Sequence, residues 1–167
     1  MAPNREHTLI LIKPDAVEQD LHLTVLARLE HTVEGSRYVA SRILQFNPDL
    51  CREHYSHLTE KPFYKNIETY MCSGHIWAAV LEGPHGMIPA IREDIGATDP
   101  TAAAKGTIRN TYGTKIDLGN GEYFTRNVVH ASESQQEAYE EIRRLFLKEE
   151  IQNSAPEFAE KLWPATE

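Results

Sequence analysis

Three features that mark large classes of protein are scarce in this chain of 167 residues. The two cysteines, Cys51 and Cys72, have neither a metal-binding nor a redox spacing, and a chain of this size does not need disulfides to fold. The apolar run near the N-terminus, residues 9–12, is too short for a signal peptide or a membrane span. Basic side chains number 17 against 25 acidic ones, a net charge of −8, which disfavours broad binding of nucleic acid. We therefore expect a soluble cytoplasmic protein without a nucleic-acid or membrane partner.

Two common phosphate-binding motifs are also absent. The chain has no GxxxxGK[ST] stretch, and it lacks the kinase glycine-rich loop with its HRD and DFG companions. No repeat or low-complexity tract interrupts the sequence. The length fits a single domain, residues 1–167, that can bury a substantial core.

Hydrophobic periodicity predicts strands interleaved with helices. Strands are expected at residues 8–13, 37–46 and 75–81, and a hairpin at residues 115–118 and 122–125 around the Gly119-Asn120-Gly121 turn. Helices are expected at residues 20–33, 48–57, 63–71, 86–95 and 134–148, with a loop over residues 96–109. This order predicts an α+β or α/β domain with helices packed on a sheet.

One histidine, His130, stands in a polar stretch directly before the helix at 134–148. A neutral imidazole is a nucleophile, and a helix start offers free N–H groups and a positive dipole end that suit a phosphate. Glu141 borders the apolar stripe of this helix, so its carboxylate could keep one ring nitrogen protonated and leave the other free to attack. The alternatives are an ordinary loop histidine and a surface carboxylate paired with Arg144.

Basic side chains occur at three separate places upstream. Lys13 ends the first strand, Arg92 lies in a short helix, and Lys105 and Arg109 belong to a glycine-containing loop. Each could converge on a phosphate, and each could equally be a solvated surface charge.

Four motifs in a fixed order add a further indication: TLILIKPDAV, HY followed by KPF, IREDIGATDPTAAAKGTIR, and NVVHASES. Together, from residue 6 to about residue 150, they resemble the nucleoside diphosphate kinase family. The resemblance implies a ferredoxin-like α+β sandwich, with a four-stranded antiparallel sheet and helices over one face. It also implies a ping-pong reaction that moves the γ-phosphate of a nucleoside triphosphate, typically ATP, to a nucleoside diphosphate through a phosphohistidine.

The resemblance assigns roles to individual residues. His130 matches the phosphorylated histidine, and Glu141 matches the glutamate that orients it. The positions that match groups holding the phosphates and the ribose hydroxyl are Lys13, Tyr55, Arg92, Thr98, Arg109 and Asn127, of which Lys13 and Tyr55 also belong to the catalytic set. Phe63 matches the aromatic that stacks on the base, although it would otherwise be interpreted as a core residue. The family implies Mg²⁺ bound mainly through nucleotide phosphates, with no protein ligand assigned, and a homo-oligomer.

The chain departs from the family pattern most clearly between Arg109 and Asn127, where about seventeen residues replace a shorter loop. The predicted hairpin, near residues 114–126, occupies this insertion. In the family this loop lies near both the nucleotide and the subunit contacts. The base preference and the number of subunits are therefore left open by the sequence.

Two other classes of function fit parts of the sequence. A binding module could keep the fold and lose turnover, but every catalytic position of the family is filled here by the expected residue type. A histidine phosphorelay protein would pass its phosphate to an aspartate, but the matches at Asn127 and Phe63 point to ribose and base. The pair His54 and His57 suggests a metal site, yet no third ligand stands nearby.

Overall fold

A four-stranded antiparallel sheet lies at the centre of the computed structural model, which describes residues 5–119 and 121–165. The strand order is β2-β3-β1-β6. Its strands are β1 (Arg5–Ile12), β2 (Arg37–Gln45), β3 (His75–Pro84) and β6 (Val129–Ala131). The apolar run predicted to be a central strand is β3, and it does lie between two neighbours.

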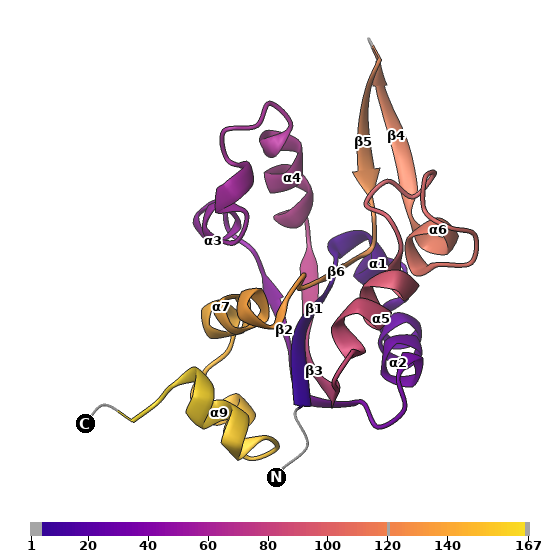
Figure 1. The fold of residues 1–167 in the computed structure, drawn as a ribbon. Helices are drawn as coiled ribbons and strands as arrows, with labels where there is room; N and C mark the ends of the chain where they lie inside the picture. The colour runs from indigo at the N-terminus through magenta and orange to yellow at the C-terminus, as the bar shows by residue number, and fades with distance from the viewer. Residues whose placement is uncertain (1–4, 120, 166–167) are drawn as a thin grey trace.

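The predicted hairpin is present as a separate two-stranded sheet. It consists of β4 (Thr114–Gly119) and β5 (Glu122–Arg126), and it projects away from the rest of the fold (Figure 1). Of its predicted turn, Asn120 lies outside the described residues.

Helices surround the central sheet. They are α1 (Pro14–Glu18), α2 (His22–Thr32), α3 (Pro48–His54), α4 (Tyr64–Met71), α5 (Met87–Ile95), α6 (Ile108–Tyr112), α7 (Gln135–Leu145), α8 (Lys148–Gln152) and α9 (Pro156–Leu162), with a 3₁₀ turn, η1 (Ser56–Leu58). The sequence did not predict α1, α6, α8 and α9, because helices of five to seven residues are too short to show a clear 3.6-residue period. No helix in the described ranges is long and apolar enough to cross a membrane.

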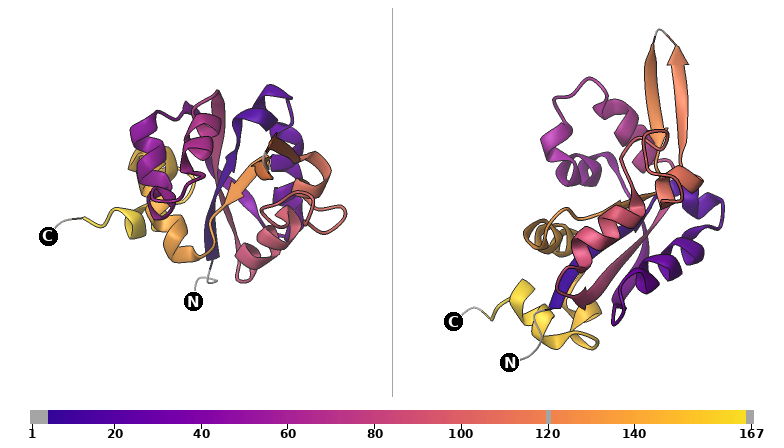
Figure 2. Two further views of the ribbon diagram at one scale, coloured as in Figure 1. Left: turned by 90° about the horizontal axis from the view of Figure 1, so that it is seen from above. Right: turned by 45° about the vertical axis from the view of Figure 1, so that its right-hand side comes forward.

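Helices cover both faces of the sheet, so the expectation of helices over one face is wrong (Figure 2). Leu9 and Leu11 of β1 point into a core shared with α7 and α9, whereas Ile10 and Ile12 point into a second core shared with α2 and α5. All four side chains are fully buried. The continuous apolar run of β1 is the physical sign of this arrangement, since a strand with one solvated face would alternate.

The stretch predicted as a polar turn around His130 is in fact strand β6, at the edge of the sheet. It pairs with β1, where Leu11 and His130 are register partners. Val128, the residue directly before β6, has a φ of +60°. This left-handed conformation is rare for a β-branched residue and costs about 1–3 kcal/mol. Its buried side chain and its carbonyl, which accepts the Lys13 amide at 2.8 Å, hold this conformation at the start of β6.

Candidate active site

His130 is hydrogen-bonded to Glu141, which reaches back from the second turn of α7. The imidazole Nε2 lies 2.9 Å from Oε1 of the carboxylate. Ser132, two residues after His130, donates its hydroxyl to the other oxygen, Oε2, at 2.6 Å, and it accepts the amide of Leu9 from β1 at 3.0 Å. Glu141 is only 5% exposed, which rules out the alternative of a surface carboxylate. His130 in β6 and Ser132 just after it thus hold the carboxylate at both of its oxygens.

This contact determines which nitrogen of His130 is free. A carboxylate accepts hydrogen bonds, so Nε2 carries the proton and Nδ1 keeps its lone pair. Burial raises the pKa of Glu141, but the contacts with His130, His54 and Ser132 outweigh burial and hold the pKa at about 2, so the carboxylate is ionised. The His130 side chain is 17% exposed, and no hydrogen bond from the described residues reaches Nδ1. In the neutral form of the ring, this arrangement leaves the lone pair of Nδ1 available.

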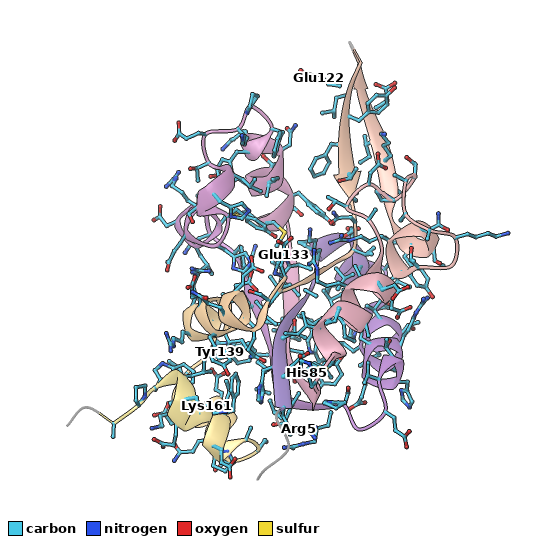
Figure 3. The ribbon with its side chains drawn as sticks, viewed as in Figure 1. Arg5, His85, Glu122, Glu133, Tyr139 and Lys161 are labelled. Carbon is cyan, nitrogen blue, oxygen red and sulfur yellow. The ribbon has the colours of Figure 1, made fainter. Side chains whose placement is uncertain are left out.

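Two guanidinium groups flank His130 along β6. Arg109 donates from Nη2 to the carbonyl of Val129 at 2.9 Å, and Arg92 donates from Nη1 to the carbonyl of Ala131 at 3.0 Å. These carbonyls belong to the residues on either side of His130. Arg92 also forms an ion pair with Glu133, at 3.1 Å. Glu133 lies two residues after the end of β6 and is labelled in Figure 3. Residues 92 and 109, distant in sequence, are therefore anchored to the same three-residue strand.

Lys13 belongs to a chain of buried polar groups beside these arginines. Its Nζ donates to Oδ1 of Asn127 at 2.6 Å, and Nδ2 of Asn127 donates to the carbonyl of Thr98 at 3.1 Å. Burial, and secondly the charge of Arg109, lower the pKa of Lys13 to about 7, while the charge of Asp15 opposes the change. Burial and the charge of Arg92 likewise lower the pKa of Arg109, to about 10. A bound anion would relieve both costs, since it favours the charged form of each group.

Tyr55 and Phe63 approach the site in different ways. Tyr55 is buried, and its hydroxyl has no hydrogen-bond partner among the described residues. Its ring meets the edge of His54 at 4.9 Å between centroids, and His54 in turn meets His130 at 5.4 Å. Phe63 caps the start of α4 with its side chain 49% exposed, so it is not a core residue. The structure thus brings Tyr55 into the packed cluster and leaves Phe63 at the surface.

The sequence interpretation missed two residues of this cluster, Ser132 and His54. Ser132 stands within the NVVHASES motif, two positions from the histidine, and that spacing is the available sequence signal. His54 was considered only as half of a metal pair with His57, which is exposed on η1. In the described part of the chain, the one group of potential metal ligands is His54, His130 and Glu141, whose ligand atoms lie within 4.8 Å of one another. His57 is not a member of it.

Comparison with known proteins identifies the family to which this fold belongs. The model of the family described as "Nucleoside diphosphate kinase" matches residues 6–151. The curated nucleoside diphosphate kinase of Archaeoglobus fulgidus is 40% identical over 148 residues, which cover 89% of this chain and 91% of that protein. One from Thermus thermophilus is 38% identical over 146 residues, covering 87% of this chain and 98% of that protein.

Solved structures give the same result. The Aquifex aeolicus nucleoside diphosphate kinase superposes with a TM-score of 0.76 at 37% identity, covering 88% of this chain and 99% of that one. The Halobacterium salinarum enzyme, solved in complex with CDP, has a TM-score of 0.76 at 33% identity, with coverage of 89% and 91%.

These likenesses put the chain among the phosphotransferases and identify its sheet and helices as a ferredoxin-like α+β fold. It belongs to the nucleoside diphosphate kinase family.

Proposed function

We propose that this chain transfers the γ-phosphate of a nucleoside triphosphate, typically ATP, to a nucleoside diphosphate, and that His130 carries the phosphoryl group between the two half-reactions. The observation that carries the proposal is the pairing of Nε2 with Glu141 at 2.9 Å, which leaves Nδ1 its lone pair on a strand whose carbonyls on either side of His130 accept from two guanidinium groups. Relatives of the same family, one of them solved with CDP, support a nucleotide as the ligand.

The first half-reaction forms a bond between Nδ1 of His130 and the γ-phosphorus. The bond from that phosphorus to the β–γ bridging oxygen breaks, and the nucleoside diphosphate leaves with the electron pair. In the second half-reaction a β-phosphate oxygen of another diphosphate attacks the phosphohistidine, and the nitrogen recovers its lone pair. Negative charge spreads over the phosphoryl oxygens during each transfer, so fixed positive charge at Arg92, Arg109 and Lys13 lowers both barriers.

The remaining residues hold the nucleotide. Arginine can donate two parallel hydrogen bonds to phosphate oxygens, and Lys13 supplies a compact charge near the transferring group. Tyr55 offers its unpaired buried hydroxyl as a donor. Asn127 and Thr98 act at the phosphates and the ribose hydroxyl, while Phe63 stacks on the base. Every base has a π-face, so stacking on an exposed ring predicts low selectivity among bases.

Magnesium fits this site as an ion carried by the nucleotide. Mg²⁺ prefers oxygen ligands, whereas the one group of potential metal ligands in the described residues has two imidazoles and a single carboxylate. When bound, the ion neutralises charge on the β- and γ-phosphates, and the protein residues position the phosphoryl group. We further propose that residues 1–167 act as a single domain in a cytoplasmic homo-oligomer.

Incubation with γ-labelled ATP tests the proposal. The chain should acquire an acid-labile label that several nucleoside diphosphates remove, and His130→Ala should abolish it. The matched control is His57→Ala, which removes an exposed imidazole and should leave the label in place. Absence of label on the unaltered chain would favour a binding module, and a label that diphosphates cannot discharge would favour a phosphorelay protein.

A further inference from the structure

His54, the last residue of α3, is a buried histidine to which the proposed reaction gives no role. Its side chain is fully shielded from solvent, and its ring packs edge-to-face against Phe46, Tyr55 and His130. Its nitrogens point to two groups of opposite charge. Nδ1 lies 3.5 Å from Nη1 of Arg144, and Nε2 lies 3.5 Å from Oε1 of Glu141.

These two neighbours determine where the proton of His54 lies. A guanidinium group can only donate, so the nitrogen that faces Arg144, Nδ1, must be the acceptor. The proton of the neutral ring is therefore on Nε2, directed at the carboxylate. At 3.5 Å this contact is a charge–dipole approach and not a hydrogen bond, so the buried Nε2 has no hydrogen-bond partner among the described residues. Arg144 is held in turn by Glu53 at 3.1 Å.

The surroundings keep His54 neutral. Burial, together with the neighbouring His130, Arg144 and Lys13, lowers the pKa of His54 to about 3, while Glu141 opposes the change. These groups approach from β6, from α7 and from the residue after β1, and Tyr55 is a further titratable residue packed against the ring. A neutral donor can support the carboxylate without cancelling the charge that Glu141 offers to His130.

We propose that His54 is a positioning residue, whose Nε2–H supports Oε1 of Glu141 and thereby keeps His130 in the tautomer that leaves Nδ1 free. Glu141 would then be held by hydrogen bonds from Ser132 at one oxygen and His130 at the other, with the dipole of the His54 N–H group beside the second oxygen. Orienting partners of this kind set the tautomer and direction of a reactive imidazole, and their loss typically costs about 10- to 100-fold in activity. The kinetic part of this inference depends on the proposed function, whereas the tautomers do not.

Nitrogen-15 NMR of the nucleotide-free chain tests the tautomers directly. His130→Gln and His54→Gln assign the two rings by loss of their signals. The expected result is a protonated Nε2 and an unprotonated Nδ1 in both rings. A proton on Nδ1 of His54 would overturn the proposal without the need for any further variant.

Two substitutions of similar size then distinguish the effect of the Nε2–H donor from the effect of filling the space that the ring occupies. His54→Gln can place an amide N–H near the position of Nε2, whereas His54→Leu fills the space without a donor. We expect His54→Leu to mix the tautomers of His130 and to slow its phosphorylation about 10-fold with little change in KM, and His54→Gln to recover most of the rate. A leucine variant with the native tautomer and rate would refute the role. Failure of the unaltered chain to accept phosphate would instead refute the proposed function, while leaving the NMR result intact.

Discussion

The two ends of the proposed nucleotide site are built in different ways. Around His130, the buried Glu141 carboxylate accepts hydrogen bonds from His130 and Ser132, and the Ser132 hydroxyl accepts in turn from the Leu9 amide of β1, so these groups have little freedom. Around Phe63, the ring lies at the start of α4 and is 49% exposed. Bond formation requires atoms held to within fractions of an ångström, whereas stacking on a base tolerates displacement. The fold therefore concentrates its polar contacts at the reacting end and leaves the base-facing end simple.

The largest effect is expected from the cations at the reacting end. Arg109→Ala or Lys13→Ala should reduce phosphorylation of His130 about 10²- to 10³-fold, because each removes fixed positive charge from the transferring phosphoryl group. Single-turnover labelling measures this rate, and circular dichroism checks that the fold is retained. Lys105→Ala is the matched control, since Lys105 lies exposed in the loop directly before α6, the helix that carries Arg109. An unchanged rate in either variant would remove that residue from the site.

A smaller loss is expected from the carboxylate that orients the nucleophile. Glu141→Gln keeps the size of the side chain but removes its charge, so we expect kcat to fall about 10- to 100-fold with KM nearly unchanged. Glu140→Gln makes the same chemical change at the preceding, exposed position and should have no effect. If both variants behave alike, the short contact to His130 has no catalytic role.

The depressed pKa of Lys13 predicts uptake of protons when a nucleotide binds. With a pKa of about 7 in the free chain, much of the amine is neutral above that pH, and a bound phosphate raises the pKa again. Affinity should therefore be greatest below about pH 7 and weaken as the pH rises toward the pKa of the complex. Calorimetry at about pH 8, in buffers of different ionisation enthalpy, should detect up to about one proton per nucleotide. Lys13→Met should abolish this uptake, and equal uptake in the variant would assign the proton to another group.

The smallest effect is expected at the base-facing end. Phe63→Ala should cost about 1 kcal/mol, or roughly a 5-fold rise in KM, and the rise should be similar for diphosphates of different bases. Tyr123→Ala removes another exposed aromatic, on the hairpin, as a control. If the KM of the Tyr123→Ala variant alone depended strongly on the base, the base would be recognised by the hairpin and not by Phe63 at the start of α4.

Continuous local patterns were sufficient to predict much of this fold. The apolar runs of β1 and β3 have few alternatives to buried strands, and the glycine-rich turn specified the hairpin. Strand β6 escaped prediction because three residues cannot show alternation, and the polar groups around them favoured a turn. The second helical layer was missed for a different reason: the resemblance implied one covered face.

The contacts of the site likewise include some that the sequence could suggest and others that depend on tertiary packing. His130 and Glu141 are only 11 residues apart, on a strand and on the helix that follows it, so the sequence could suggest their contact. The position of His54 depends on packing of α3 against α7, and no spacing between residues 54 and 141 encodes it. Arg92 and Arg109 were expected to converge, but their anchoring on the carbonyls beside His130 follows only from the edge position of β6.

The pairing of β6 with β1 has a consequence for how nucleotides pass through this molecule. The backbone of His130 is tied to Leu11, and the carbonyl of Val128 holds the amide of Lys13, so nucleophile and amine share one rigid frame. In the proposed reaction, the nucleoside triphosphate that donates the phosphate and the diphosphate that accepts it then bind in turn at this one site, and the first nucleotide dissociates before the second binds.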